Sequence, residues 1–403
     1  MLVGYATRSM LVAFGGLAAG AALLPCPATR WDAKPPIALP PARSFIHTVA
    51  KPNDLAIDDE HAWLASMADD LMPTVERCGA IHFRGFDVTK SKEGFRKFCS
   101  ALPLRPCCDP LSSIGVRSLL SEAEGIYEAV DAASTASTFI GLHNDATYKL
   151  AAPYAAFVCF QPAASGGAFL LADGHAILRA IEPRVLEQLL ARQMRVRVAA
   201  LPIGRVVQPL PSTLQAPLRT LIRALVGAGI RLALPLDLDV AWAADGEVLQ
   251  ILEQAKPAVN RHPRTQLATF FSGIHSQSRA LQQRRAGAAF SGVAATDVYW
   301  GDGGPIEEEV LDHLDETITK HTTPLLMEAG DVVLLDSYSV LHGRQTFRGA
   351  RQHGVQWLSD GAGGGSGVDQ GGDAGGGGAS LLSGLVNQLA VKRPGRSASG
   401  GEG

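Results

Sequence analysis

A histidine and an aspartate stand two positions apart in the apolar, strand-like run FIGLHNDATYKL, residues 139–150. Alternate residues of a β-strand point to the same face of a sheet, so the side chains of His143 and Asp145 are expected to share one face. An imidazole and a carboxylate on one face can hold a metal ion, and metals that also bind oxygen are often held by two histidines and one carboxylate. The run therefore predicts a sheet that carries a metal site, and it requires a second histidine from elsewhere in the chain.

The best candidate for that second histidine is His342. It follows the apolar strand pattern DVVLLD and opens the segment LHGRQTF. Its side chain is therefore expected to point from the end of a strand into the mouth of a barrel. The histidines without such a context are expected to be ordinary core residues, and they include His82, His175, His262, His275 and His321.

The composition narrows the class of partner. A chain of 403 residues with 46% hydrophobic residues can bury a large core, in one large domain or two smaller ones. The formal charge of −3 and the lack of a long basic run argue against nucleic-acid binding. The six cysteines are scattered without the spacing of a zinc site, which favours a reduced interior. We therefore expect a small-molecule partner, no nucleic acid, and no membrane contact except through the N-terminal segment.

The two ends of the chain differ from its middle. Residues 1–31 contain two arginines, no acidic residue and the apolar run MLVAFGGLAAGAALLP, so we interpret them as a targeting segment or anchor outside the fold. A secretory signal, an organellar transit peptide and a membrane anchor all stay open. We expect an intracellular location, in a plastid or mitochondrion if the segment is a transit peptide. Residues 361–403 are Gly-rich and are predicted to be a disordered tail, which leaves 45–360 as the folded domain.

Helix and strand patterns alternate within that domain. Apolar residues at helical spacing lead to a short strand at Ala80–Phe83, a second helix follows in KEGFRKFCSAL, and a third begins near Pro183. YAAFVCF and DVVLLD have the length and composition of buried strands, and a hairpin is expected with its turn near Arg348-Gly349. Residues 200–265 show no clean period, so no element is predicted there. The pattern predicts an α+β fold with a β-sandwich or jelly-roll core.

Four segments in a fixed order carry a family resemblance: GAIHFRGFDV, then HND, then SGGAFLLAD, then GDVVLLDSYSVLHGRQTFRGARQH. From about Glu76 to Trp357 the chain resembles the taurine dioxygenase and clavaminate synthase-like branch of the iron(II)- and 2-oxoglutarate-dependent dioxygenases. The resemblance implies a double-stranded β-helix (jelly-roll) core with flanking helices. It also implies Fe(II) held by His143, Asp145 and His342, with three open positions for the bidentate co-substrate 2-oxoglutarate and for O2.

The implied activity is that of an Fe(II)/2-oxoglutarate-dependent dioxygenase. Such an enzyme hydroxylates or desaturates a small organic substrate and releases succinate and CO2. Family members that halogenate replace the metal-binding carboxylate with a small residue, so the presence of Asp145 favours oxygen insertion or desaturation. Two other functions stay open: a non-catalytic jelly-roll protein that binds metal and ligand without turnover, and a hydrolytic zinc site at the same ligands. Neither the substrate nor the oligomeric state follows from the sequence.

The segments that bind 2-oxoglutarate in relatives depart here from the family pattern. A threonine that commonly follows the Gly-Gly turn is replaced by Phe169, and an arginine pair is reduced to Arg351-Gln352. Alternation along RQHGVQWL defines an expected inward face that holds Arg351, His353, Val355 and Trp357. Arg351 is therefore predicted to bind the distal carboxylate of 2-oxoglutarate through its guanidinium.

The sequence also makes predictions for five further positions near these motifs. Arg348 is expected in solvent at the turn, and Arg344 in a surface ion pair that contributes little. Thr147, Tyr148 and His353 are candidate substrate-lining residues, although a tyrosine on a sheet is more often part of the core.

Overall fold

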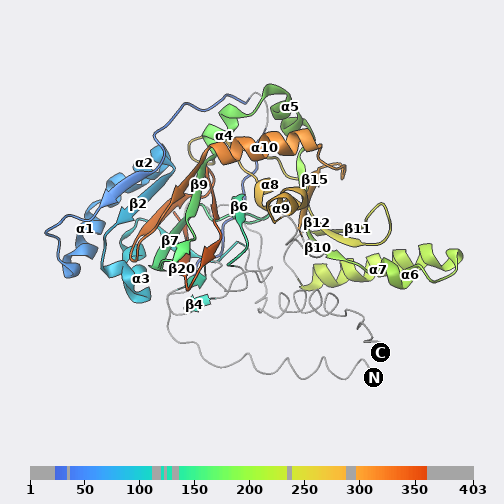
Figure 1. Ribbon diagram of the computed structural model, residues 1–403, viewed down its shortest axis with the longest axis horizontal. Helices are drawn as coiled ribbons and strands as arrows, with labels where there is room; N and C mark the ends of the chain where they lie inside the picture. The colour runs from blue at the N-terminus through green and yellow to red at the C-terminus, as the bar shows by residue number, and fades with distance from the viewer. Residues whose placement is uncertain are drawn as a thin grey trace, which may run out of the picture.

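The computed structural model describes residues 23–33, 37–110, 119–121, 125–128, 136–233, 238–286 and 296–360. The first 22 residues of the expected targeting segment and the Gly-rich residues 361–403 lie outside these ranges. The described chain mixes helices and sheets, in agreement with the predicted α+β class, and Figure 1 shows helices packed around the sheets. No helix in the described ranges has both the length and the apolar composition needed to cross a membrane.

The main sheet has eight strands in the described ranges. They are β1 (His47–Ala50), β2 (Ala80–Arg84), β3 (Arg105–Cys107), β4 (Leu119–Ser121), β5 (Ile126–Glu128), β7 (Tyr154–Gln161), β17 (Val332–Asp336) and β20 (Gln352–Ser359). Their order is β1-β2-β17-β7-β20-β5-β4, with β3 paired to β20. The strands predicted from YAAFVCF and DVVLLD are confirmed as β7 and β17, which are antiparallel neighbours in the middle of the sheet.

A smaller antiparallel sheet has four strands in the described ranges. They are β6 (Ile140–His143), β9 (Phe169–Asp173), β16 (Thr322–Leu325) and β18 (Val340–Arg344), in the order β16-β9-β18-β6. This sheet faces the main sheet, because one buried cluster joins Phe157, Val333 and Trp357 of the main sheet with Phe169 and Leu171 of the smaller one. The two sheets thus enclose one apolar core.

The strands of the main sheet are apolar on both faces. On β7, Phe157 faces the smaller sheet, whereas Val158 belongs to a second cluster with Phe83, Phe95 and Phe98. Three helices cover this second cluster, namely α1 (Glu60–Ser66), α2 (Ala68–Cys78) and α3 (Lys92–Ala101). Because both faces of β7 are buried, its sequence is continuously apolar instead of alternating.

A second group of helices covers the outer face of the smaller sheet. Leu170 of β9 packs there with Leu178, Leu189 and Leu314. These three leucines come from α4 (Gly174–Ala180), α5 (Pro183–Arg192) and α10 (Glu308–Lys320). Helix α5 begins at Pro183 as predicted, since proline is favoured in the first turn of a helix. The short helices α8 (Ile274–Gln277) and α9 (Arg279–Ala286) precede α10 in the chain, and α8 packs against β6.

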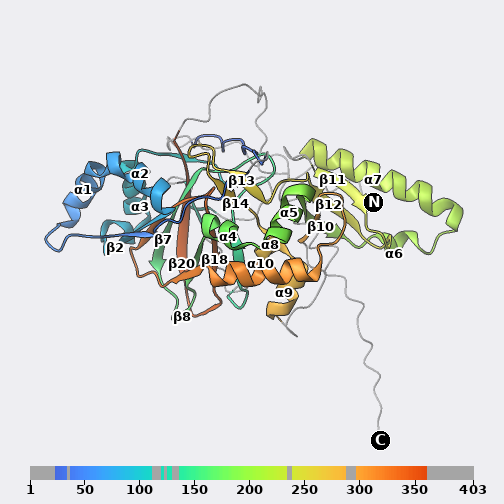
Figure 2. The ribbon, with the colours of Figure 1, turned by 90° about the horizontal axis from the view of Figure 1, so that it is seen from above.

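Most of residues 200–265, for which no element was predicted, form a lobe with its own sheet and helix. The sheet has the order β11-β12-β10-β15, and its strands are β10 (Met194–Leu201), β11 (Leu238–Trp242), β12 (Leu249–Glu253) and β15 (Asp297–Trp300). Helix α7 (Ser212–Ala233), preceded by α6 (Gly204–Val207), packs on this sheet through Ile222, Val226 and Ile230. Figures 1 and 2 show α7 at the periphery, at the opposite end of the molecule from α1.

The expected hairpin near the C-terminal end of the domain is wrong. Strand β19 (Phe347–Arg348) pairs with β8 (Ser165–Gly166), while β20 pairs with β7. The chain turns at Gly349, where φ is 85°, and passes from the two-stranded β19-β8 sheet to the main sheet. The remaining short elements are β13 (Val259–Arg261), β14 (Ala268–Phe270) and the 3-10 helices η1 (Ile57–Asp59) and η2 (Val88–Lys90).

The packed part of the chain begins before residue 45. Leu24 forms a β-bridge with Cys107 of β3. The indole of Trp31 donates a hydrogen bond of 2.7 Å to the carbonyl of Tyr148 and lies 5.5 Å from the ring of Phe271. Residues 23–31, expected outside the fold, therefore contact the domain, because their apolar side chains find partners on it.

Candidate metal centre

The two histidines predicted to bind metal lie opposite each other on neighbouring strands. β6 and β18 are antiparallel, and their register pairs His143 with His342. β6 ends at His143, so Asp145 lies two residues beyond the strand, in the loop that follows it. His342 lies within β18 and not beyond a strand end as expected. The strand pairing therefore brings His342 from the far end of the domain to the HND segment.

These residues form a cluster of metal-binding type. Ligand atoms of His143, Asp145 and His342 all lie within 4.8 Å of one another, and among the described residues no other such group occurs. Asp145 Oδ2 is 3.0 Å from His342 Nε2, and Asp145 Oδ1 is 3.5 Å from His143 Nε2. The centroids of the two imidazole rings are 4.7 Å apart. Two imidazole nitrogens and one carboxylate that face a single point match the donor set of an open Fe(II) site.

A hydrogen bond selects the nitrogen of His143 that faces the cluster. Its Nδ1 lies 2.8 Å from the carbonyl oxygen of Gly141. A carbonyl oxygen can only accept, so Nδ1 carries the proton and the lone pair of Nε2 is left for a metal. Backbone carbonyls commonly orient metal-binding histidines in this way.

Aromatic rings bound the cluster on the side of the apolar core. The ring centroid of His342 lies 4.9 Å from that of Phe157 and 6.0 Å from that of Phe169. The side chain of Asp145 is 0% exposed and that of His143 is 17% exposed, so the cluster opens to solvent beside His143. Phe169, which stands where relatives commonly have a threonine, therefore contacts a candidate ligand and keeps water from that side.

The residue between the first two ligands anchors their loop. Asn144 Nδ2 donates to the carbonyl oxygens of Ser337 at 2.9 Å and Val340 at 3.1 Å. Its Oδ1 accepts from the backbone N–H of Ser272 at 3.0 Å. These bonds tie the loop of Asp145 to the strand of His342. Sequence reasoning overlooked Asn144, although a polar side chain between two ligands in a buried run is a usable signal.

A buried histidine outside the cluster, His275, is hydrogen-bonded to the backbone of β6. His275 Nδ1 accepts a hydrogen bond of 2.8 Å from the backbone N–H of Leu142, and its Nε2 lies 3.2 Å from Asp315 Oδ1. Burial lowers the pKa of His275 below its ordinary value, while Asp315 opposes the shift. A neutral imidazole with its proton on Nε2 satisfies both contacts. His275 is thus a core residue, as expected, and it also positions the strand that carries His143.

Two buried arginines lie beside the ring of Phe347. The guanidinium carbons of Arg351 and Arg344 are 5.7 and 4.7 Å from the ring centroid. Arg351 is 7% exposed, and Val355 and Trp357 of the same expected face lie in the core between the sheets. The expectation of a surface position for Arg344 is wrong: it is 3% exposed, because it lies in a central strand of the smaller sheet.

The neighbourhood of these arginines is suited to an anion. His353 is 3% exposed, and burial lowers its pKa well below the ordinary value, with a further decrease caused by Arg351 and Arg344. His353 is therefore neutral at physiological pH. Two buried guanidinium groups on one ring can bind a carboxylate by charge-assisted hydrogen bonds. Arg348 is exposed, as predicted for a residue of the turn.

Thr147 and Tyr148, two of the candidate substrate-lining residues, make contacts within the fold. Thr147 Oγ1 accepts a hydrogen bond of 2.9 Å from the backbone N–H of Leu150, which closes the turn after Asp145. The ring of Tyr148 lies 6.1 Å from that of Trp31 in a stacked arrangement. A substrate role for Thr147, Tyr148 or His353 stays a prediction.

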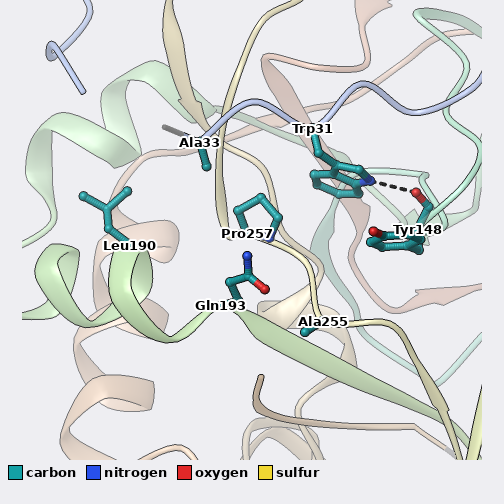
Figure 3. Close-up of a pocket in the computed structure, with 7 residues that line it drawn as sticks. All are labelled: Trp31, Ala33, Tyr148, Leu190, Gln193, Ala255 and Pro257. Carbon is teal, nitrogen blue, oxygen red and sulfur yellow. Dashed lines mark hydrogen bonds between the residues drawn. The ribbon is translucent and has the colours of Figure 1, made fainter. Parts of the chain in front are cut away.

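A surface hollow lies beside Tyr148 (Figure 3). Its volume is about 340 Å³, which is within the range of small-molecule sites. Its walls come from the N-terminal segment, from the end of α5 and from the segment after β12. The lining residues are Trp31, Ala33, Tyr148, Leu190, Gln193, Ala255 and Pro257.

A comparison with known protein families gives one match that spans most of the chain. The model of the family described as "Taurine catabolism dioxygenase TauD, TfdA family" matches residues 39–357. This range contains the smaller sheet, the main sheet up to Trp357 of β20, the three candidate ligands and the lobe with α7.

The individual relatives share little sequence identity with this chain. The dapdiamide synthesis protein DdaC of Enterobacter agglomerans is 23% identical over 279 residues, which cover 68% of this chain and 80% of that protein. The structure of PvcB from Pseudomonas aeruginosa is 16% identical with a TM-score of 0.44, over 80% of this chain and 91% of that one. An asparagine oxygenase, solved in complex with Fe(II), 3-hydroxyasparagine and succinate, is 14% identical with a TM-score of 0.41, over 74% of this chain and 79% of that one.

Proposed function

Because this chain belongs to the TauD/TfdA dioxygenase family and is an Fe(II)/2-oxoglutarate-dependent oxygenase, we propose that His143, Asp145 and His342 hold its iron. We further propose that it hydroxylates or desaturates a small organic substrate. The observation that carries the proposal is the convergence of the three ligand atoms within 4.8 Å of one another. Asp145 supplies the carboxylate that a halogenating site lacks.

We propose that the main and smaller sheets are the two halves of a double-stranded β-helix. The support is their arrangement: both are largely antiparallel, and they share one apolar core. Two candidate ligands stand on facing positions of β6 and β18. A jelly roll of this kind holds a ligand inside the barrel while its outer faces carry the helices.

Iron and 2-oxoglutarate, when bound, supply the oxidising chemistry, and the protein supplies orientation and a dry site. His143 presents Nε2 because Gly141 holds its Nδ1–H. Asn144 keeps the loop of Asp145 at a set distance from β18. Phe157 and Phe169 exclude water on the core side.

Arg351 is the proposed anchor of the distal carboxylate of 2-oxoglutarate, and Arg344 is a second candidate. Both are buried beside Phe347, and Phe347 belongs to β19 at the exit of β18, the strand of His342. With Phe169 in place of a hydroxyl, the arginines would supply most of the anchoring. The expected partners of the enzyme are therefore 2-oxoglutarate, O2 and a small-molecule substrate.

We also propose an intracellular location, with residues 1–31 as a targeting segment or anchor whose last residues, 23–31, also pack on the domain. All six cysteines are free in the structure, which fits a reducing compartment. Expression of residues 1–31 fused to a fluorescent protein tests this. Secretion of the fusion would contradict the proposal.

The enzymatic proposal is tested by mixing anaerobic protein with Fe(II) and 2-oxoglutarate. We expect a weak visible charge-transfer band, and release of succinate once O2 is admitted. His342→Ala should lose the band, whereas His321→Ala, a half-buried histidine outside the cluster, should keep it. A band without succinate across a broad metabolite panel would favour a binding protein. Absence of the band, with hydrolysis supported by Zn²⁺, would favour a zinc enzyme.

A further inference from the structure

Helix α7 carries a row of leucines that lie in solvent. Leu214, Leu221, Leu225 and Leu232 are 54%, 54%, 63% and 92% exposed. Apolar surface left in water is unfavourable, and burial against a partner would remove it from water. Single exposed leucines are ordinary, but four on one helix form a contiguous apolar patch of the kind that marks an interaction surface.

The exposed leucines belong to a pattern of six positions along the helix. The pattern runs in steps of four, three, four, three and four residues, and we call it the α7 seam: Leu214, Leu218, Leu221, Leu225, Ala228 and Leu232. Such spacing is that of a heptad repeat in which helices pack on each other. At about 100° per residue, the seam spans an arc of roughly 80° and is centred roughly 120° from the face packed on the lobe's sheet. The seam is thus separate from the face that the fold already uses.

The seam is symmetric about the position of Arg223. Reversing the helix about this point exchanges 214 with 232, 218 with 228, and 221 with 225. Two antiparallel copies would therefore place every seam residue opposite another seam residue. Leu218 would meet Ala228, a large side chain against a small one, which allows close approach of the helices. This self-complementarity is what a two-fold dimer interface requires.

The charges on α7 favour a second copy over a membrane surface. The helix contains Arg219, Arg223 and Arg231 and no acidic residue. Arg219 lies 5.1 Å over the ring of Trp242, on the packed side, and Arg223 falls about 180° from the seam. A helix that lies on anionic lipid carries its basic residues beside the apolar face. Arg223, at the symmetry centre, points away from the seam. Arg231, about 100° from the seam centre, would lie opposite Gln215 of the other copy, so two copies meet without opposed charges.

We propose that the chain forms a homodimer in which the α7 helices of two copies pack antiparallel through the seam. The seam is about 27 Å long at 1.5 Å per residue, on a helix about 10 Å wide. This strip is smaller than the roughly 800 Å² per partner of a standard interface. The dimer is therefore weak and depends on protein concentration. Its formation is independent of iron and 2-oxoglutarate.

Sedimentation of the full chain from low to several hundred micromolar tests the dimer. The wild-type mass should rise from that of one 42.4 kDa chain toward twice that value. The double variant Leu221→Glu/Leu225→Glu should stay at one chain, with dimerisation weakened at least about tenfold. Ala216→Glu/Thr220→Glu is the matched control, since both residues are exposed, have the same spacing and lie away from the seam. The control should dimerise as wild type.

Cross-linking between single cysteine variants tests the direction in which the two α7 helices pack. In a mixture, Leu214→Cys copies should cross-link to Leu232→Cys copies and not to one another. Preferential linkage between two Leu214→Cys copies would overturn the antiparallel arrangement. A monomer at every concentration, or a dimer that survives the double glutamate variant, would overturn the proposal. So would a monomer that binds anionic phosphatidylserine vesicles through the same leucines.

Discussion

Replacing Asn144 by alanine should weaken metal binding without removing any ligand. Asn144 donates to the carbonyls of Ser337 and Val340 and accepts from the N–H of Ser272. The Val340 bond ties the loop of Asp145 to the strand that carries His342. Without these bonds the loop gains freedom to move relative to β18, so the ligands spend less time in the geometry that binds iron.

The size of the effect follows from the number of bonds. Three hydrogen bonds at a net 0.5–1.5 kcal/mol each predict that the free energy of unfolding falls by about 1.5–4.5 kcal/mol. The side chain is 9% exposed, so water replaces little of this loss. The melting temperature should fall by roughly 2–7 °C for a domain of this size. Iron affinity should fall about 10–100-fold, the range for residues that orient metal ligands.

Asn260→Ala is the matched control. Asn260 is 0% exposed, and its side chain also makes three bonds to backbone, with the carbonyl of Arg30 at 2.8 Å and the N–H groups of Asp32 at 2.7 Å and Arg261 at 3.0 Å. The two variants should therefore lose similar stability. Thermal melts measure that loss, and anaerobic Fe(II) titration at saturating 2-oxoglutarate measures iron affinity. Only Asn144→Ala should bind iron more weakly.

Equal iron affinities in the two variants would refute this reasoning. They would show that β6 and β18 alone set the ligand geometry, and that Asn144 contributes only to stability. A large loss of affinity in both variants would show that the titration reports general loosening of the fold.

Three further predictions concern the ligands, the co-substrate and pH. Alanine in place of any one of the three proposed ligands should abolish Fe(II)-dependent succinate release while the melting temperature stays within a few degrees, and near-normal activity would remove that residue from the site. Arg351→Ala should weaken 2-oxoglutarate by about 1.5–3 kcal/mol, roughly tenfold or more, whereas Arg348→Ala should change it little; a co-substrate titration with the reverse order would place the anchor at the turn. Burial lowers the pKa of His175 from 6.5 to about 4, so below pH 6.5 the unfolded chain binds a proton that the native protein does not. Stability should then fall by up to about 3 kcal/mol between pH 6.5 and 4, and His175→Gln should flatten this part of the curve of melting temperature against pH; an unchanged slope would show that His175 titrates normally in the native state.

Local periodicity in the sequence was enough to predict several of the elements that surround the site. The continuous apolar runs of β7 and β17 and the helix that begins at Pro183 were predictable, because burial on both faces or a proline in the first turn leaves a local signature. The sequence also predicted that His143 and Asp145 converge, but the strand alternation behind that prediction ends at His143, and Asp145 reaches the cluster from the loop after β6. The elements of residues 200–265 were not predictable. Helix α7 is apolar on the face packed on the sheet and again along the seam, so its apolar residues do not follow one helical period.

Tertiary structure alone decided how these parts meet. The pairing of β6 with β18 sets His342 opposite His143, and no local pattern encodes a register between segments so far apart in the chain. The same applies to Asn144, whose partners come from two other segments, and to Arg344, which is buried only because its strand is central in the smaller sheet. The sequence by itself determined which side chains were available to hold a metal. The fold determined their distances and burial, because both depend on contacts between residues remote in sequence.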